Sequence, residues 1–447
     1  MSTDAVLASE HHARERDDGR AGRALLIAGV AVAALAAAAY AAALAAGPAR
    51  LLLKGFDLAV YLGGAGQALH HPAHLYAWTY QGHPGIKFTY TPFAALAFAA
   101  GRVLPFRALL GLVAVVSVAC LLATIWIAFR ELGWKSLTRR TGATLLLGGI
   151  ALWSEPVQRG LNLGQVELGL MALVVWDLCQ DDKRWWKGAA TGLAAGIKFI
   201  PGLFILYLLI TKRFRQAFVA IGAFAASVGI GFAALPGPSG PFWLRGDFFA
   251  ASRTGFVGSL QNQSLRGAAT RLAGSVDGGM LPWLAAAVIV IGLGLWAASR
   301  LHNAGYAFAG LMVTGLVAQL ASPISWDHHW VWYVPGVAVL ADAAVRAGRG
   351  RARAAWYTLA GVVVAAFAAW PDFWQPSFSL FQGGLINYAP MASFESGDNP
   401  AYPEYHWHGL QLVAGNLYVL TGLGLLAVAL AAAVTVTRRR RAAAASG

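Results

Sequence analysis

The sequence has few charged residues and little cysteine, and both shortages exclude classes of protein. Only 12% of its 447 residues are charged, whereas soluble domains carry about 25%. Its 2 cysteines, Cys120 and Cys179, lie in apolar runs, which excludes a disulfide framework and a cysteine metal motif. The sequence also lacks a glycine-rich phosphate loop and a nucleophile motif. These absences argue against a soluble nucleotide-binding enzyme.

Long apolar runs are abundant instead. Apolar residues make up 58% of the chain, and a helix of about 20 such residues crosses the hydrocarbon of a membrane. The runs lie near 25–46, 91–104, 108–129, 142–157, 163–179, 188–210, 214–235, 281–299, 304–321, 330–345, 355–370 and 409–436. We therefore predict an all-α polytopic membrane protein with about 12 transmembrane helices.

The net charge of +14 reflects membrane topology rather than nucleic-acid binding, which we exclude. The basic residues lie at the ends of apolar runs, as in "RRRR" at 438–441 and "RAGRGRAR" at 346–353. Positively charged loops stay on the cytoplasmic side and also contact anionic lipids. We therefore predict a multi-pass plasma-membrane protein with both termini in the cytoplasm.

Alternation of the spans predicts the domain organisation. A disordered cytoplasmic tail over 1–22 precedes a single transmembrane domain over 23–437, and a cytoplasmic basic tail follows over 438–447. The predicted external loops are 47–90, 236–280, 322–329 and 371–408. The same alternation places the basic loops 130–140 and 181–187 outside, against the positive-inside rule. The orientation of the helices between 91 and 215 therefore stays open.

The first external loop contains a candidate general base, Asp57. Apolar residues flank it on both sides, as on a helix at the membrane surface. Desolvation raises the pKa of a carboxylate and so makes it a better base near neutral pH. The alternative is that Asp57 caps a short helix. Further along this loop, Tyr90 precedes Pro92 and suits the aromatic belt of a membrane interface.

Two cations interrupt the apolar runs. Lys198 lies inside the run 188–210, where it is costly without an anion. That anion is either a protein carboxylate or the phosphate of a ligand. Arg159 lies near Glu155, one helical turn away, so it is either half of a structural ion pair or part of a binding site.

Polar side chains gather in a second external loop. "QNQSLRG" contains Asn262, Gln263 and Arg266. Amide side chains both donate and accept hydrogen bonds, so they suit sugar hydroxyls. The alternative is an ordinary polar loop.

The stretch "SPISWDHHWVWYVP" at 322–335 places His328 and His329 at an external interface. Adjacent residues of a helix point about 100° apart, so the pair is not expected to share one metal ion. Contact with a phosphate, or orientation of an acceptor hydroxyl, fits two histidines better. One of them is equally consistent with an interfacial role.

Together these residues suit glycosyl transfer from a lipid phosphate. A carboxylate takes the proton of the acceptor, and cations stabilise the departing phosphate. The alternative from another class is a lipid or solute transporter with broken helices. A transporter is expected to place its polar groups near the midplane, whereas most of these candidates lie at one face.

Five motifs in this order resemble glycosyltransferase family 87, the polyprenyl-phosphate-mannose-dependent α-1,2-mannosyltransferases of the GT-C superfamily. They are "FDLAVYLGGAG", "NLGQVELGLMAL", "GIKFIPGLFILYLL", "QNQSLRG" and "SPISWDHHWVW". The resemblance covers roughly 50–435. It is strongest for actinobacterial members that act in phosphatidylinositol mannoside synthesis. An α-1,2 branching enzyme of lipomannan and lipoarabinomannan is the alternative within the family.

The resemblance implies a GT-C-type fold with periplasm-facing loops and an external active site. It implies a polyprenyl-phosphate-mannose donor, a phosphatidylinositol mannoside acceptor and transfer with inversion. It also implies that Asp57 is the base, and that Lys198, His328 and His329 bind the donor phosphate or position the acceptor. Asp57 has no neighbouring carboxylate in its loop, so we expect no metal and no cofactor. The resemblance assigns no role to Glu167.

Overall fold

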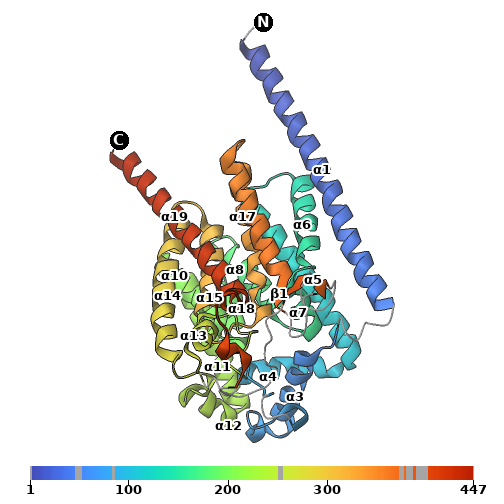
Figure 1. The fold of residues 1–447 in the computed structure, drawn as a ribbon, viewed down its shortest axis with the longest axis vertical. Helices are drawn as coiled ribbons and strands as arrows, with labels where there is room; N and C mark the ends of the chain where they lie inside the picture. The colour runs from blue at the N-terminus through green and yellow to red at the C-terminus, as the bar shows by residue number, and fades with distance from the viewer. Residues whose placement is uncertain are drawn as a thin grey trace.

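The protein is a bundle of helices. A computed structural model describes residues 3–45, 53–82, 86–249, 255–371, 377–378, 386–388 and 401–445. The start of the first helix and the end of the last lie at the same end of the bundle (Figure 1). In the described residues the strands are three short ones, β1 (Ala369–Pro371), β2 (Ser377–Phe378) and β3 (Ile386–Tyr388), in the order β1-β3-β2. The predicted helical class is confirmed.

Within the described residues, five helices are long and apolar enough to cross a membrane. They are Gly19–Ala42 within α1 (Thr3–Ala45), α5 (Phe106–Glu131), α11 (Phe214–Ala234), α14 (Met280–Asn303) and Leu417–Ala443 within α19 (Leu417–Ala445). A sixth candidate is the pair α7 (Glu155–Leu163) and α8 (Glu167–Leu178), which is bent by 113°. The predicted count of about 12 spans is not confirmed.

The other helices are shorter or interrupted. They are α3 (Phe56–His70), α4 (Pro92–Ala99), α6 (Leu137–Ala151), α9 (Ala189–Ile197), α10 (Leu203–Ile210), α12 (Pro236–Ser239), α13 (Leu265–Ala273), α15 (Ala307–Ala321), α16 (Tyr333–Arg346), α17 (Arg351–Ala368) and α18 (Leu410–Gly415). The interruptions have local causes. Gly164, with φ of 72°, ends α7 in the left-handed conformation. Thr91 starts α4, because its hydroxyl accepts a hydrogen bond from the backbone N–H of Ala94 at 3.0 Å.

The basic loops lie together at one end of the bundle, which we call the basic end. Arg130, near the end of α5, donates to the backbone oxygen of Cys179 after α8 at 2.9 Å. Arg346, at the end of α16, donates to the backbone oxygen of Leu132 at 2.6 Å. The loop 130–140 therefore lies beside the loops that follow α8 and α16. Strict alternation placed it at the opposite end, and that placement is wrong.

The loop 181–187 lies at the basic end as well. Its Asp182 contacts both ends of a helical hairpin that α9 and α10 form. Lys187, just before α9, donates to Asp182 Oδ1 at 2.8 Å. Arg213, just after α10, donates to the same oxygen at 2.6 Å. The chain therefore leaves the basic end in α9 and returns to it in α10. The prediction that 188–210 is one span is wrong.

The hairpin packs closely against α11. A Cβ atom on Gly192 would lie 2.1 Å from the backbone oxygen of Ala220, and one on Gly196 would lie 2.1 Å from Ser227 Oγ. Glycine is needed here for the close approach of two helices. With 9 residues, α9 rises about 13 Å, less than half of the hydrocarbon thickness. Its tip, at Lys198, therefore lies inside the bundle.

The helix α1 packs along α6. A Cβ atom on Gly29 would lie 2.3 Å from the backbone oxygen of Gly142, and the Tyr40 hydroxyl donates to the backbone oxygen of Leu152 at 2.8 Å. The helix begins at Thr3, so it covers most of the segment 1–22 that was predicted to be disordered. Extending an existing helix costs little, because the turn that nucleates it is already formed.

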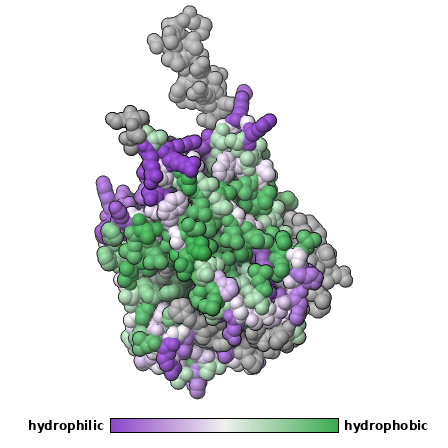
Figure 2. Space-filling model, turned by 60° about the vertical axis from the view of Figure 1, so that its left-hand side comes forward, coloured by the Kyte–Doolittle hydropathy of each residue, from purple (hydrophilic) through white to green (hydrophobic). Residues whose placement is uncertain are grey.

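The predicted external loops meet at the end opposite the basic loops, which we call the site end. Contacts between them are Tyr76 on Phe242 (ring centroids 5.2 Å), Phe256 on Tyr402 (4.6 Å) and a backbone bridge between Asn262 and Trp326. Figure 2 shows a belt of hydrophobic side chains around the middle of one face, with hydrophilic side chains above and below it. The two polar ends and the apolar belt match a membrane-spanning bundle.

The main apolar core lies between α5, α8, α15 and α16. Leu121, Met171, Val317 and Val334 are fully buried in it. Lipid tails are as apolar as these side chains, so close van der Waals packing rather than exclusion of water holds the helices together. A packed core of this kind supports the polar site that is described next.

Candidate functional site

Asp57 lies in the first turn of α3, at the site end. Gly55 precedes this helix with φ of 67°, and its N–H donates to the backbone oxygen of Asn162 at 2.8 Å. This contact fastens the start of α3 to α7. The Asp57 carboxylate accepts a hydrogen bond from Gln165 Nε2, in the break between α7 and α8. A residue 108 positions away therefore orients the predicted base.

Gln165 connects Asp57 to two tyrosines. Its Oε1 accepts from the Tyr61 hydroxyl at 2.5 Å and from the Tyr90 hydroxyl at 3.4 Å. The two hydroxyls are 2.8 Å apart, and both side chains are buried. Tyr90 therefore belongs to the site, and its assignment to an interfacial belt is wrong. A continuous hydrogen-bonded network runs from the carboxylate into the bundle.

Lys198, at the tip of the hairpin, continues this network. Its Nζ pairs with Glu167 Oε1, lies 3.4 Å from the Tyr90 hydroxyl and lies 2.8 Å from His329 Nε2. Because an ammonium group only donates, His329 Nε2 accepts and Nδ1 carries the ring hydrogen. The sequence left open whether Lys198 faces a protein carboxylate or a ligand. The structure supplies the carboxylate of Glu167.

The second histidine is oriented by its neighbour in the 3-10 helix η8 (Asp327–Trp332). Asp327 Oδ1 lies 2.8 Å from His328 Nδ1 and accepts from the His328 backbone N–H at 2.7 Å. Arg159 Nε lies 4.0 Å from Asp327 Oδ2. Arg159 therefore pairs with Asp327, rather than with Glu155 as the structural alternative supposed.

Buried polar atoms without a hydrogen-bond partner are concentrated here. In the described part of the chain they include Glu155 Oε1, Arg159 Nε, Glu167 Oε2, Asp327 Oδ2, His328 Nε2 and His329 Nδ1. Each such atom costs about 1–3 kcal/mol. Native proteins keep few of them, so a group at one place indicates a site that a polar ligand completes.

The surroundings of Asp57 tune its proton affinity. Burial raises the pKa of this carboxyl above its ordinary value, although His328, Gln165, Arg159 and Lys198 each oppose the rise. The four opposing groups show that Asp57 and both cations act within one electrostatic environment. A carboxylate with a raised pKa accepts a proton more readily near neutral pH.

The pKa values of Asp327 and His329, both in η8, are lowered rather than raised. Burial alone would raise the pKa of Asp327, but the hydrogen bond from His328 and the charge of Arg159 hold it below its ordinary value. Burial, followed by the charges of Lys198 and His328, lowers the pKa of His329 well below its usual range. His329 is therefore neutral at pH 7, in agreement with its role as an acceptor from Lys198.

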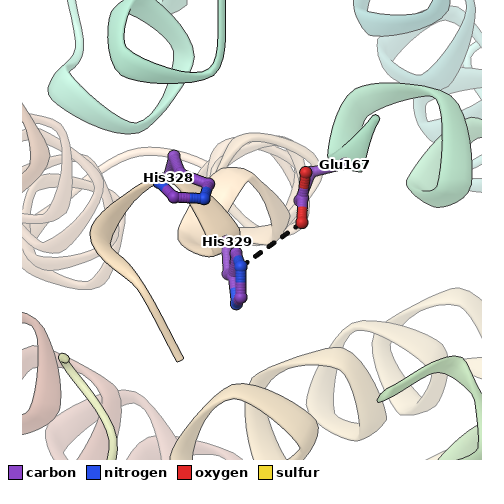
Figure 3. Close-up of side chains that lie close together, drawn as sticks. All are labelled: Glu167, His328 and His329. Atoms are coloured by element: carbon purple, nitrogen blue, oxygen red, sulfur yellow. Dashed lines mark ion pairs between the residues drawn. The ribbon is translucent and has the colours of Figure 1, made fainter. Parts of the chain in front are cut away.

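One group in the described residues has the donor atoms for a metal ion. The ligand atoms of Glu167, His328 and His329 lie within 4.8 Å of one another. Figure 3 shows these three side chains around a common space, with His329 Nε2 3.3 Å from Glu167 Oε1. Lys198 Nζ bonds to both of these atoms. A divalent ion would have to displace an ammonium that already supplies positive charge there.

The structure does not support substrate binding by Asn262 and Gln263. Asn262 Nδ2 donates to the backbone oxygens of Val257 (2.9 Å) and Pro323 (3.3 Å), and its Oδ1 accepts from the Ser325 N–H. Gln263 bonds in the same way to the backbone of Leu260, Gly415 and Tyr418. Both side chains are fully buried. Their amides fasten the external loops to one another, which agrees with the structural alternative, and a substrate-binding role for them stays a prediction.

Arg266 lies outside the hydrogen-bonded network that the described residues form around Asp57. It is buried, and its guanidinium carbon stacks 5.0 Å from the ring centre of Trp283. Of the predicted site residues, the structure thus gathers Asp57, Lys198, Arg159, His328 and His329. The side chains of Arg266, Asn262 and Gln263 take no part in the described hydrogen bonds and ion pairs of this group, although the backbone of Asn262 pairs with that of Trp326, next to Asp327.

Several residues of the site were not assigned from the sequence. Gln165, Tyr61 and Glu167 connect Asp57 to Lys198. Glu155 accepts from the Tyr418 hydroxyl at 3.0 Å and lies within hydrogen-bonding reach of Asp327. The signal in the sequence was the polar interruption of two apolar runs, which carries both glutamates and Gln165.

Comparison with known proteins identifies the family. The family model of glycosyltransferase family 87 matches residues 88–323, more than half of the chain. The chain belongs to glycosyltransferase family 87. The family-87 match begins after Asp57 and ends before Asp327, so these two parts of the site are placed by the structure rather than by the match.

Relatives with assigned activities cover a similar length. The chain is 33% identical over 329 residues to the polyprenol-phosphate-mannose-dependent alpha-(1-2)-phosphatidylinositol pentamannoside mannosyltransferase of Mycobacterium tuberculosis (strain CDC 1551 / Oshkosh), covering 71% of this chain and 74% of the relative. It is 33% identical over 336 residues to the protein of the same name from Mycolicibacterium smegmatis (strain ATCC 700084 / mc(2)155), covering 71% and 78%. A polyprenol-phosphate-mannose-dependent alpha-(1-2)-phosphatidylinositol mannoside mannosyltransferase of Mycobacterium tuberculosis (strain ATCC 25618 / H37Rv) is 29% identical over 313 residues, covering 68% and 70%. No solved structure matches the chain significantly. This family-87 protein is a helical membrane glycosyltransferase.

Proposed function

We propose that the protein transfers mannose from polyprenyl-phosphate-mannose to a hydroxyl of a phosphatidylinositol mannoside, forming an α-1,2 linkage with inversion. The names of the family-87 relatives support the donor, the acceptor and the linkage. The observation that carries the mechanism is the network from Asp57 through Gln165 and Tyr90 to Lys198 and His329. It joins a base to a cation in one site.

In the proposed reaction Asp57 takes the proton of the acceptor hydroxyl. The acceptor oxygen bonds to the anomeric carbon of mannose while the bond from that carbon to the phosphate oxygen breaks. The polyprenyl phosphate leaves with the electron pair of the broken bond. It needs no general acid, because a phosphate is a good leaving group when its charge is stabilised.

Lys198 and the histidines stabilise that charge in the proposal. Lys198 binds the phosphate by directing one of its N–H donors to a phosphate oxygen instead of to Glu167. The Nδ1 hydrogen of His329 has no partner among the described residues and is available to a ligand. Asp327 keeps His328 oriented, and Arg159 adds positive charge nearby. Because Lys198 occupies the centre of the Glu167 and His329 group, we propose that the reaction needs no metal.

For the topology, we propose that the basic end faces the cytoplasm and the site end faces outward, with both termini in the cytoplasm. In this arrangement the runs 91–104 and 188–210 do not cross the membrane. The first forms the short helix α4 at the site end, and the second folds back as the hairpin. About ten of the predicted runs then remain as crossings, which keeps an even number.

The experiment that tests the function is mannosyl transfer by the purified protein in proteoliposomes. The donor is polyprenyl-phosphate-mannose, and the acceptors offered separately are a phosphatidylinositol mannoside and lipomannan. We expect an α-1,2-mannosylated phosphatidylinositol mannoside. Preference for lipomannan would indicate the branching enzyme. Transport of a labelled donor without any glycosyl transfer would overturn the proposal.

A pair of variants separates the phosphate role of Lys198 from its structural role. Lys198→Met leaves the Glu167 carboxylate buried without a partner, which destabilises the fold by about 3–5 kcal/mol. The double variant with Glu167→Gln removes that unpaired charge, so we expect its stability to recover. Its transfer activity stays low if Lys198 binds the donor phosphate. Recovery of both stability and activity would show that Lys198 only balances Glu167.

A further inference from the structure

A cavity lies at the basic end, remote from Asp57. It has a volume of about 230 Å³ and lies between the C-terminal ends of α14 and α19. Its lining consists of Arg300, Asn303, Val436, Thr437, Arg440 and Arg441. Three of these six residues are arginines and none is acidic. The cavity therefore concentrates positive charge from two helices that are distant in the sequence, with Arg300 on α14 and Arg440 and Arg441 on α19.

The three arginines have no anionic partner in the part of the chain that the structure describes. The described ion pairs and hydrogen bonds include none from Arg300, Arg440 or Arg441, although the Arg300 guanidinium stacks 5.9 Å from the ring centre of Trp296. The polar neighbours are already engaged: the Thr437 hydroxyl donates to the Ala433 backbone oxygen at 2.7 Å. Guanidinium groups around one hollow repel each other, and an anion between them removes that repulsion.

The position of the cavity defines the kind of anion. Both α14 and α19 are candidate membrane spans, and the cavity lies at their ends, where hydrocarbon gives way to water. Trp296, on whose ring Arg300 stacks, is 38% exposed, as expected for an interfacial residue. Arginine forks match phosphate oxygens in pairs. Lipid phosphates lie at this depth, and basic pockets between transmembrane helices bind such headgroups.

We propose that this cavity is a binding site for a phosphate group, carried by the headgroup of an anionic lipid in the leaflet at the basic end. A free phosphate ion offers the same chemistry, so the two sources are distinguished by experiment. The site is separate from the transfer reaction, and it holds the end of α19 against the end of α14.

The chain offers a matched pair of variants for the test. Arg440→Ala with Arg441→Ala removes two charges that line the cavity, and Arg438→Ala with Arg439→Ala removes two charges from the same run that do not line it. Full-length protein is placed in nanodiscs of phosphatidylcholine with phosphatidylglycerol. Bound phosphatidylglycerol is then measured by native mass spectrometry after release. We expect roughly tenfold weaker retention for the 440/441 variant, and little change for the 438/439 variant.

The other helix provides an independent check. Arg300→Ala removes the contribution of α14, and we expect it to weaken retention in the same way. Equal losses for the 440/441 and 438/439 variants would overturn the proposal, because general surface charge would then explain binding. Retention that is unaffected by all three changes would overturn it as well.

A second arm identifies the source of the phosphate. Inorganic phosphate is titrated into lipid-free detergent samples, and thermal stability is compared with samples given phosphatidylglycerol. Stabilisation by the lipid alone, lost in the 440/441 variant, supports the headgroup. Stabilisation by inorganic phosphate alone would overturn the lipid assignment. The readout is binding, so failure of the proposed mannosyl transfer would leave it unaffected.

Discussion

Replacing Asp57 with asparagine removes the proposed base while it changes the shape of the side chain very little. The asparagine oxygen still accepts the hydrogen bond from Gln165 Nε2, so the link between α3 and the break after α7 is kept. The negative charge that faces Lys198, Arg159 and His328 is lost. The amide cannot take the acceptor proton, so the substitution isolates the chemical step.

The expected size of the effect follows from this role. A positioned general base contributes about 10²–10⁴-fold to the rate. At about 1.4 kcal/mol for each factor of ten, Asp57→Asn raises the barrier by about 3–5 kcal/mol. Burial raises the pKa of Asp57 toward the working pH, which favours the upper part of this range. The KM for the acceptor is expected to change by less than about threefold, because the shape of the site is preserved.

The assay is initial-rate mannosyl transfer in proteoliposomes, with kcat and KM fitted separately. The matched control is Asp277→Asn, which removes one negative charge from an exposed residue of the loop between α13 and α14. We expect the control to retain full activity. Full activity in Asp57→Asn, or an equal loss in both variants, would refute the assignment of Asp57 as the base.

Three further predictions test the role of Gln165 in the network, the expectation that transfer needs no metal ion, and the packing of the hairpin. Gln165→Leu removes a hydrogen bond that lowers the pKa of Asp57, so this pKa is expected to rise. Because protonated Asp57 accepts no proton, the acid limb of the pH profile of kcat/KM is expected to move to higher pH. An unchanged pH profile would contradict this. Treatment with EDTA is expected to leave transfer unchanged, since Lys198 supplies the charge, whereas a loss restored by a divalent metal would contradict that role. Gly192→Val forces α9 away from α11 and is expected to lower the unfolding free energy by about 1–3 kcal/mol, measured by thermal denaturation in detergent. Gly222→Ala, on the open side of α11, is the control and is expected to be neutral.

Part of the site was predictable because polar residues are costly in an apolar chain. Lys198 and Arg159 interrupt apolar stretches, and His328 and His329 lie directly before one; such costly polar groups mark functional or paired sites. The roles of Asn262 and Gln263 were less predictable. An amide suits a sugar hydroxyl and a backbone peptide equally well, so residue type alone does not separate the two uses.

The fold was predictable to the level of a helical membrane bundle with its basic loops at the span ends. Its crossings were not, because alternation assumes that every apolar run traverses the membrane. The run 188–210 has the composition of a span, yet Lys198 and Pro201 break it into two short helices. In the proposed topology neither this run nor 91–104 crosses the membrane, so the loops 130–140 and 181–187 between them change sides.

By itself the amino-acid sequence determined that the chain is a membrane protein, that its basic residues lie at the ends of apolar runs, and that a few costly polar groups must be used or paired. These properties follow from the composition and from the spacing of apolar and polar residues along the chain, which a hydropathy profile shows directly. Only the tertiary structure decided which groups share a site. Asp57, Gln165, Lys198 and His329 come from four separated segments, and their meeting depends on a folded-back hairpin and on close helix contacts at glycine. Such long-range packing depends on how all the helices fit together, and no local pattern encodes it.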